Sequence, residues 1–253
     1  FHTGFGTAAV RLAMPDIGLV SFGEMVEQVR LIANAVNIPV LADADTGYGN
    51  AINVYRTVKE YIRAGAAGLI IEDQVWPKRC GHLPGKQVVP LSEMVERIKG
   101  ALRARNEEDP DFVIGARTDA LAVYGIDEAI KRARKFAELD VDFVFVEAPT
   151  DRGQIERIAR EVKAPLLLNL VEGGKTPLIT LEEAKQLGFK IILYPVSALL
   201  ATTKAVLEVF RHLRERGTTV DILDRLMSFK EFESVVGLDK FLKLADELKV
   251  TEP

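Results

Sequence analysis

The sequence predicts an α/β fold in which repeated strand–helix units surround a parallel sheet, as in a TIM-type (β/α) barrel. Short β-branched runs alternate with longer amphipathic stretches, which is the pattern of such units. Polar residues also stand at the end of one predicted strand after another, as they do at the catalytic face of a barrel. The 253 residues, 48% of them hydrophobic, are enough for one large domain with a sizeable core.

Six strands are predicted from apolar, β-branched runs, at residues 38–45, 68–73, 112–119, 143–148, 164–171 and 190–196. Helices are predicted between them where apolar residues recur every three or four positions, at 53–64, 92–105, 126–139, 152–162 and 180–187. The last of these begins with Thr180-Leu-Glu-Glu183, a capping-box pattern. No low-complexity linker interrupts the series, so we expect residues 1–253 to form a single barrel domain, with C-terminal helices in 198–253.

Composition excludes several classes of function. A formal net charge of −4 gives no electrostatic footprint for nucleic acid, so no such partner is expected. One cysteine excludes an intramolecular disulfide framework and suits a reducing compartment. No signal peptide and no membrane-spanning apolar run is visible, which predicts a soluble cytoplasmic protein without a membrane partner.

The pentapeptide Lys78-Arg79-Cys80-Gly81-His82 places the only cysteine between two cations and a histidine, shortly after a predicted strand. Neighbouring positive charge favours the thiolate, and His82 could exchange a proton near neutrality. Gly81 permits a tight backbone path. Because a lone intracellular cysteine is more often buried and inert, the pentapeptide alone leaves both a chemical role and a packing role open.

Two carboxylates, Asp43 and Asp45, follow the apolar end of the first predicted strand and precede Thr-Gly-Tyr-Gly49. On an extended segment, side chains two residues apart point to the same side. Crowded carboxylates repel one another unless a hard cation neutralises them, and the glycines leave room for ligand and water around Mg²⁺. A solvated turn is the common alternative, but Glu72 and Asp73 at the end of the next strand favour the metal.

Polar residues are predicted at the carboxyl ends of all six strands: Asp43, Asp45, Glu72, Asp73, Arg117, Asp119, Glu147, Asn169 and Ser197. Any one of them could instead cap the following helix or satisfy backbone groups. Their repetition across six units is harder to explain in that way, and it predicts an active site at this edge of the sheet.

These motifs resemble the isocitrate lyase and phosphoenolpyruvate mutase superfamily, on the side of the methylisocitrate lyases and the dimethylmalate (petal-death-like) lyases. Lys-Arg-Cys-Gly-His is the signature of that branch. The other motifs occur in the expected order over nearly the whole chain: Asp-Ala-Asp-Thr-Gly-Tyr-Gly, Ala116-Arg-Thr-Asp-Ala120, Val146-Glu-Ala-Pro149, Asn169-Leu-Val-Glu-Gly-Gly174 and Tyr194-Pro-Val-Ser197. The resemblance implies a (β/α)₈ barrel with a swapped C-terminal helix in a homotetramer, a dimer of dimers.

The resemblance also implies a Mg²⁺ ion, for which Mn²⁺ could substitute. Asp43, Asp45 and Glu72 match its site, with Asp45 and Glu72 acting through metal-bound waters. The family's substrate-binding positions correspond here to the backbone of Thr3, Gly4 and Phe5, to Asp16 and Gly81, to Arg117 as a bidentate clamp, and to Glu147 and Asn169 on the far side.

Cys80 matches the general acid on a loop that closes over the substrate. The implied reaction removes the hydroxyl proton of a 2-hydroxy acid, breaks its C2–C3 bond, and protonates the departing carbanion from Cys80. The group that takes the hydroxyl proton is left open among Tyr48, Lys78 and His82.

Two features depart from the methylisocitrate lyases. Leu200 stands where they have an arginine for a distal carboxylate, which favours an alkyl substituent in the substrate, or else Leu200 simply packs in the core. The start, Phe1-His-Thr-Gly-Phe-Gly6, resembles the end of a barrel strand, so further strands are expected upstream of Phe1.

The function predicted first is a carbon–carbon lyase acting on a 2-alkylmalate or a methylisocitrate-like acid. The alternatives are a phosphonate-forming mutase of the carboxyphosphonoenolpyruvate or phosphoenolpyruvate type, and an oxaloacetate hydrolase. A non-catalytic barrel is disfavoured because the acidic pair and the thiol are both intact.

Overall fold

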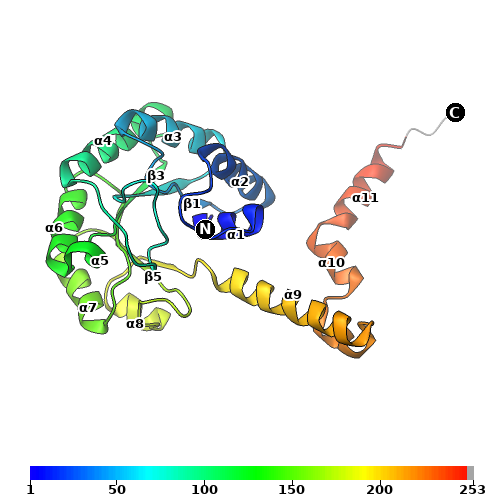
Figure 1. Cartoon of the computed structure of the whole chain (residues 1–253). Helices are drawn as coiled ribbons and strands as arrows, with labels where there is room; N and C mark the ends of the chain where they lie inside the picture. Colours follow the sequence, from blue (N-terminus) through cyan, green and yellow to red (C-terminus); the bar gives the residue numbers. More distant parts are fainter. Residues whose placement is uncertain (250–253) are drawn as a thin grey trace. The chain divides into compact units, whose positions relative to one another are not determined.

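A computed structural model describes residues 1–249, and their contacts divide into two compact units, Phe1–Leu199 and a second that begins at Leu200. The first unit holds a curled parallel sheet with helices around its outer face (Figure 1). Its strand order follows the chain: β1 (Leu41–Asp43), β2 (Gly68–Glu72), β3 (Val113–Thr118), β4 (Phe143–Val146), β5 (Leu166–Asn169) and β6 (Ile191–Leu193). The predicted TIM-like α/β fold is confirmed, and each strand lies inside its predicted range.

The helices of the first unit follow the strands. They are α1 (Gly4–Leu12), α2 (Phe22–Ala35), α3 (Ala51–Arg63), α4 (Leu91–Glu108), α5 (Leu121–Tyr124), α6 (Ile126–Ala137), α7 (Arg152–Glu161) and α8 (Leu181–Gln186). Thr180 caps α8 in a capping box with Glu183, as its sequence predicts. Helices α1 and α2 were not predicted, although Ser21 and Glu24 also form a capping box at the start of α2.

At the amino terminus His2 extends the sheet, but residues 4–6 do not. His2 pairs in parallel with Ala42 beside β1, donating its N–H to Leu41 O at 2.9 Å. The hydroxyl of Thr3 then accepts the N–H of Gly6 and caps α1, so the strand-like interpretation is confirmed at His2 and wrong for residues 4–6.

Alternate strand residues face opposite sides of the sheet, and each side is buried. Leu69, Ile71, Val144 and Val146 belong to the large core between sheet and helices. A smaller cluster lies inside the curl of the sheet: Ile70, Phe143, Phe145, Leu167 and Leu193, with Leu41 and Val113 packed against it. The residue two positions further along a strand therefore also points into the curl.

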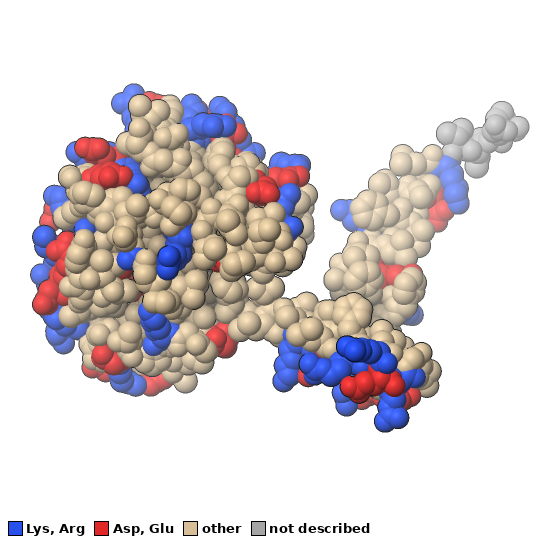
Figure 2. Space-filling view, viewed as in Figure 1, with Lys and Arg blue, Asp and Glu red and all other residues tan. Residues whose placement is uncertain are grey.

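The second unit consists of most of α9 (Ser197–Arg216), the 3₁₀ helix η1 (Val220–Arg225), α10 (Phe229–Val235) and α11 (Leu238–Glu247). Its apolar residues are largely exposed, among them Phe210 at 64%, Phe229 at 79% and Phe241 at 63%. In the face seen in Figure 2, charged groups gather along α9, while uncharged atoms cover much of α10 and α11. Leu200 is 44% exposed, and its role in substrate choice stays a prediction.

Across residues 1–249, no helix has both the length and the apolar character that crossing a membrane requires.

Candidate active site

The alternation of the strands brings the predicted site residues together at the carboxyl end of the sheet. Each lies two positions after a residue that points into the curl, as Glu72 follows Ile70, Glu147 follows Phe145 and Asn169 follows Leu167. Asp43 follows Leu41 in the same way, and Arg117 follows Gly115 on β3. Arg117 stands above this apolar floor, with its guanidinium 5.3 Å from the centre of the Phe145 ring.

One half of the site is a group of carboxylates around a buried ammonium. Lys78 Nζ lies 2.6 Å from Asp16 Oδ1 and 2.7 Å from Asp45 Oδ1, and all three side chains are almost fully buried. Burial alone would lower the pKa of Lys78, but Asp45 and Asp16 raise it well above its ordinary value. Burial together with Asp43 and Asp16 raises the pKa of Asp45 to about 6, although Lys78 opposes the shift. Lys78 is therefore protonated here.

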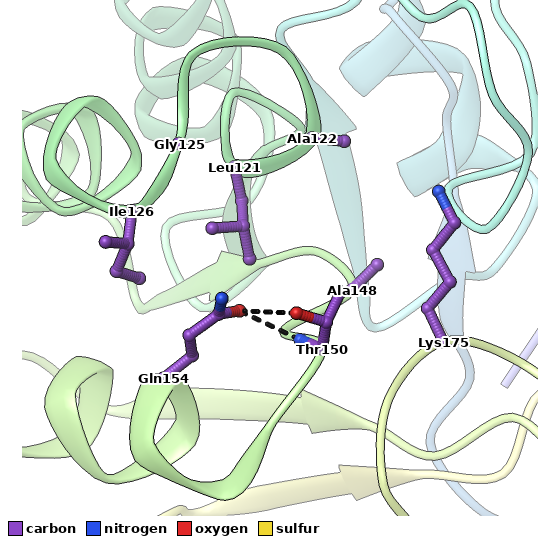
Figure 3. A pocket seen from close by; sticks show the side chains of 8 residues that line it. All are labelled: Leu121, Ala122, Gly125, Ile126, Ala148, Thr150, Gln154 and Lys175. Atoms are coloured by element: carbon purple, nitrogen blue, oxygen red, sulfur yellow. Dashed lines mark hydrogen bonds between the residues drawn. The ribbon is translucent and has the colours of Figure 1, made fainter.

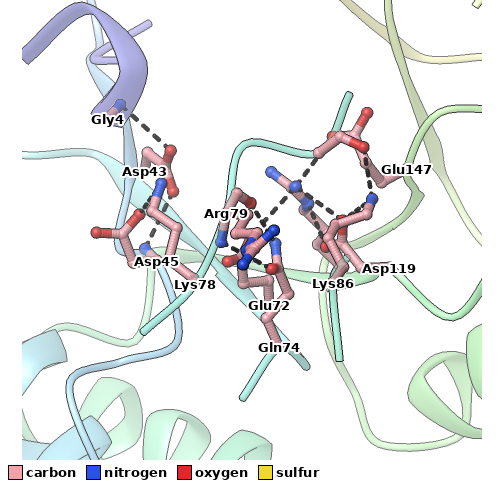
Figure 4. Close-up of polar contacts among 12 residues, drawn as sticks. Gly4, Asp43, Asp45, Glu72, Gln74, Lys78, Arg79, Lys86, Asp119 and Glu147 are labelled. Atoms are coloured by element: carbon pink, nitrogen blue, oxygen red, sulfur yellow. Dashed lines mark hydrogen bonds and ion pairs between the residues drawn. The ribbon is translucent and has the colours of Figure 1, made fainter. Parts of the chain in front are cut away.

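The other half is organised by Arg117, whose partners Glu72, Asp119 and Glu147 are labelled in Figure 4. Its Nε and Nη2 donate to the two oxygens of Asp119 at 2.9 and 3.1 Å, and Nη2 also lies 3.1 Å from Glu72 and 3.3 Å from Glu147. Burial tends to raise the pKa of Glu147, but Arg117 and then His82 outweigh it and lower that pKa to about 2. Three carboxylates therefore surround the Arg117 guanidinium and Asp119 occupies its Nε–Nη2 edge, so the binding of a substrate carboxylate by Arg117 stays a prediction.

Cys80 lies in the connection between β2 and α4, residues 73–90, and is half-buried. Its backbone N–H donates to Asp16 O at 3.0 Å. Burial raises the pKa of the thiol above its ordinary value, and the nearby carboxylates of Asp16 and Glu147 add to this, although a backbone N–H of His82 acts in the opposite direction. The expectation that Lys78 and Arg79 favour the thiolate is wrong.

The reason lies in the direction of the two cations. Lys78 points to Asp16 and Asp45, while the exposed Arg79 donates to Pro84 O at 3.0 Å. Cys80 therefore carries its proton at neutral pH, which is the state that a proton donor requires.

The ring of His82 joins two segments that are far apart in the chain. Its Nδ1 accepts the backbone N–H of Lys175 at 2.9 Å, so the ring proton is on Nε2, which lies 3.3 Å from Glu147 Oε1. Gly174 leaves room for the ring, because a Cβ there would lie 2.7 Å from Nδ1. The lone pair of Nδ1 is therefore occupied by the Lys175 N–H, while Nε2 has no hydrogen-bond partner among residues 1–249.

Tyr48 lies beside the acidic pair, with its hydroxyl 3.3 Å from Asp45 Oδ2 and 3.3 Å from the hydroxyl of Tyr61. Burial raises the pKa of Tyr48 well above its ordinary value, and Tyr61 and Asp45 add to the effect. Tyr48 and Asp45 both have positive φ angles, 63° and 48°, a conformation that L-residues rarely adopt outside functional turns.

The predicted backbone nest at Thr3, Gly4 and Phe5 coincides with the first turn of α1. Gly4 N–H donates to Asp43 Oδ2 at 3.2 Å, so this turn faces the acidic pair. Backbone N–H groups of a first helical turn have no partner within the helix, which suits them to an anionic oxygen.

The donor set fits a hydrated hard cation rather than a fully ligated one. Within residues 1–249, no three His, Cys, Asp or Glu side chains stand close enough together to ligate one ion. However, Glu72 Oε1, Asn169 Oδ1 and Glu172 Oε2 are buried oxygens without a hydrogen-bond partner among those residues, and Glu72 and Asn169 are predicted site residues. Buried acceptors of this kind fit metal-bound water, which the family resemblance implies for Asp45 and Glu72.

Several functional contacts were not predicted. Lys86 Nζ, almost fully buried, lies 2.6 Å from Asp119 Oδ1 and 2.5 Å from Gly81 O. Ser197 donates to Glu172 near Asn169, and Tyr61 donates to Asp43 O at 3.0 Å. Except for Lys86 and Gly81, the partners in each pair are 18 to 33 positions apart, and no local pattern identifies them.

Two pockets border the site. One, of about 310 Å³, lies beside the end of β4 and is lined by Lys175 and Gln154 among others (Figure 3). The amide oxygen of Gln154 accepts the backbone N–H of Thr150. The other, of about 570 Å³, lies against the Cys80 segment and is lined by Trp76, Arg79 and Lys86 among others.

Comparison with known proteins identifies the family to which this chain belongs. The phosphoenolpyruvate phosphomutase family matches residues 1–214. A 2-methylisocitrate lyase from Aeropyrum pernix is 46% identical, with 92% of this chain and 74% of that protein covered. A chloroplastic carboxyvinyl-carboxyphosphonate phosphorylmutase from Arabidopsis thaliana is 44% identical over 96% and 73%, and a 2,3-dimethylmalate lyase from Eubacterium barkeri is 43% identical over 95% and 82%.

Solved structures agree with this assignment. A 2,3-dimethylmalate lyase structure has a TM-score of 0.91 and 40% identity, over 97% of this chain and 81% of that one. An oxaloacetate acetylhydrolase with 3,3-difluorooxalacetate has the same TM-score and identity, over 97% and 83%. A phosphonopyruvate hydrolase with oxalate and Mg²⁺ has a TM-score of 0.84 and 31% identity, over 98% and 86%. The chain therefore belongs to the phosphoenolpyruvate mutase and isocitrate lyase superfamily of enzymes, within which dimethylmalate and methylisocitrate lyases are among its near relatives.

Proposed function

We propose that the protein is a Mg²⁺-dependent carbon–carbon lyase that cleaves a 2-hydroxy di- or tricarboxylic acid, a 2-alkylmalate or a methylisocitrate-like acid. The products are an α-oxo acid and a carboxylic acid. The observation that carries the proposal is the position of the Cys80 segment: Gly81 packs directly against Glu147 and Arg117, and the Cys80 N–H donates to Asp16 O, so the thiol belongs to the site that holds the acidic residues. A site with an anion-binding cation and a neutral acid nearby suits protonation of a carbanion.

In this reaction, substrate binding and proton transfer fall to different residues. Arg117 and the first-turn N–H groups of α1 bind substrate carboxylate, while Glu147, Asn169 and Gly81 form the far wall. When the C2–C3 bond breaks, its electron pair stays on the departing carbon, and Cys80 transfers its thiol proton there. The hydroxyl of the other fragment becomes the oxo group after losing its proton.

That hydroxyl proton needs an acceptor, for which Tyr48, Lys78 and His82 remain the candidates. In the present arrangement Lys78 is protonated, Tyr48 is a neutral phenol and Nδ1 of His82 accepts the N–H of Lys175. Lys78 or Tyr48 must therefore lose a proton, or His82 must release its hydrogen bond from Lys175, before that group can accept the hydroxyl proton.

Asp43 would hold Mg²⁺, with Mn²⁺ as a substitute, and Asp45 and Glu72 would contact it through water. A bound divalent cation supplies Lewis-acid stabilisation of negative charge on substrate oxygens. Asp43→Ala should abolish Mn²⁺ binding measured by electron paramagnetic resonance. Binding of Mn²⁺ to Asp43→Ala with wild-type affinity would place the metal elsewhere.

The reaction is tested with a panel of 2-hydroxy and 2-oxo dicarboxylic acids plus phosphonopyruvate, each with Mg²⁺ and with excess chelator. Release of an α-oxo acid from an alkylmalate, lost in chelator, is the expected result. Oxalate formation would favour oxaloacetate hydrolysis, and P–C rearrangement would favour a phosphonomutase. Both alternatives stay open because a phosphorylmutase and an oxaloacetate acetylhydrolase are close to this chain.

We also propose that the enzyme is a cytoplasmic homotetramer, a dimer of dimers that exchanges C-terminal helices. Support comes from the large apolar side chains that the second unit leaves exposed, and from a composition with a single free cysteine.

A further inference from the structure

Lys86 lies in the same β2–α4 connection as Cys80, and it carries a buried charge that the proposed chemistry does not use. Its side chain is 1% exposed, and that of its partner Asp119 is 0% exposed. An ammonium in such a place is costly unless it is paired and hydrogen-bonded, so its contacts identify what it holds. Nζ donates to Asp119 Oδ1 at 2.6 Å and to Gly81 O at 2.5 Å.

The contact with Gly81 holds two parts of the β2–α4 connection together. The Gly81 carbonyl lies in the peptide that joins Gly81 to His82, directly after Cys80. Leu83 N–H also donates to Cys80 O at 2.9 Å, which makes a tight turn between the thiol and Lys86. Lys86 therefore sets the path of the backbone that carries Cys80 and His82.

The contact with Asp119 fixes that turn to the sheet. Asp119 follows β3, and its backbone N–H donates to Asp73 Oδ1 at 2.8 Å. Its carboxylate is the one that holds Arg117 through two hydrogen bonds. One buried carboxylate thus holds both the loop cation and the guanidinium that we place on the substrate.

We infer that Lys86 is a positioning residue, which holds residues 75–88 closed on Asp119 and so places Cys80 over Arg117. The role of Cys80 as the proton donor to a carbanion rests on the proposed function. The closure of residues 75–88 is independent of that function, because it follows from the contacts of Lys86 alone.

The single cysteine gives a direct test. Iodoacetamide reacts with the thiolate, so the alkylation rate measured at several pH values gives both the thiol pKa and a limiting rate that reports access to Cys80. Lys86→Met keeps the length of the side chain and removes its charge. Loss of charge-assisted hydrogen bonds should raise the limiting rate by about tenfold to a hundredfold.

Two variants serve as controls. Lys135→Met removes an exposed ammonium that pairs with Glu138 on α6, and should alkylate as wild type does. Lys86→Arg keeps a positive donor, and should restore part of the protection that Lys86→Met loses. If Lys86 only stabilised the fold, Lys86→Arg would restore the limiting rate no further than it restores the melting temperature.

A folded Lys86→Met protein whose limiting rate equals that of wild type would overturn the inference. Where Lys86→Met yields no folded protein, Lys86→Gln carries the same test, since it also removes the charge but leaves a polar group in the buried position. Turnover is measured separately. A faster alkylation in a protein without lyase activity would keep the closure and reject the proposed function.

Discussion

Cys80 illustrates that the state of a side chain depends on its neighbours in space rather than in sequence. Two cations flank it in the chain, yet both point elsewhere, and burial raises its pKa. The thiol thus starts in the protonated form, which a proton donor needs and a nucleophile does not.

Cys80→Ser should separate catalysis from binding. A serine hydroxyl keeps the size of the side chain but is a much weaker acid, so kcat should fall on the order of a thousandfold. Binding of oxalate with Mg²⁺, measured by titration calorimetry, should change little. A serine enzyme within a few-fold of wild type would reassign the thiol to packing.

The raised thiol pKa also fixes the sign of the pH dependence. Because the folded protein holds the proton more tightly than free cysteine does, the donor form persists to higher pH. The basic limb of the kcat–pH profile should therefore fall above the ordinary cysteine pKa and coincide with the pKa from alkylation. A basic limb below that value would contradict the assignment.

Gly81→Ala should prevent closure of the segment over the site. A Cβ at this position would lie 2.5 Å from side-chain carbons of Glu147 and 2.7 Å from Arg117 Nη2. Since small misplacements can cost about a hundredfold in rate, kcat/KM should fall by at least roughly tenfold. Gly23→Ala in α2, where a Cβ meets nothing within 4 Å, is the matched control and should leave the activity unchanged.

At the scale of the element, buried charges hold the ends of β2 and β3 together. Asp73 accepts from Thr118 Oγ1 at 2.7 Å and from Asp119 N–H at 2.8 Å, and Arg132 of α6 donates to it at 2.9 Å. Arg132 also donates to Val89 O at 2.9 Å. Helix α6 therefore stabilises the platform on which Asp119 orients Arg117 and Lys86.

Arg132→Met should destabilise the protein by about 3–5 kcal/mol, because it leaves the Asp73 carboxylate buried without its cation. Urea denaturation followed by circular dichroism measures this loss. Lys131→Met is the matched control, since Lys131 pairs with the same Glu128 but its side chain is 66% exposed. That variant should change the free energy of unfolding by less than about 1 kcal/mol. Equal losses in both variants would contradict the role given to Asp73.

The strand ends could be predicted from sequence because a period of two and a row of polar residues are local signals. Asp43, Glu72 and Glu147 follow from that pattern, and so does the edge of the sheet where they meet. The ion pair of Lys86 with Asp119 spans 33 positions, and the contact of His82 with Lys175 spans 93. Such contacts depend on how the loops fold over the sheet, which periodicity does not encode. Helix α1 was missed because Gly4 and Gly6 weaken its helical pattern.

At the scale of the whole molecule, the second unit has too few buried residues to be stable alone. Among its residues up to 249, Ile222 is the only buried apolar side chain. Phe229, Phe232 and Phe241 are all more than half exposed. Exposed apolar area of this kind is stabilised when a partner covers it. A second copy of the chain is the partner that we propose.

Sedimentation velocity should therefore give a mass that is a multiple of 27.9 kDa at micromolar concentration. Phe232→Glu places a charge on the apolar surface and should shift the distribution toward smaller species. Lys204→Glu, also exposed on the second unit, should keep the wild-type distribution. A wild-type protein that remains a monomer at every concentration would rule out the tetramer.

The surroundings that keep Cys80 protonated also bear on oxidative damage. Peroxides oxidise thiolates to sulfenic acid much faster than they oxidise thiols, so a raised pKa slows this reaction at neutral pH. With only one cysteine in the chain, no neighbouring thiol of the same subunit can rescue an oxidised Cys80 by forming a disulfide. The burial that keeps the proposed proton donor in its thiol form thereby also slows its oxidation, and loss of that burial would expose the single thiol of this chain to peroxide.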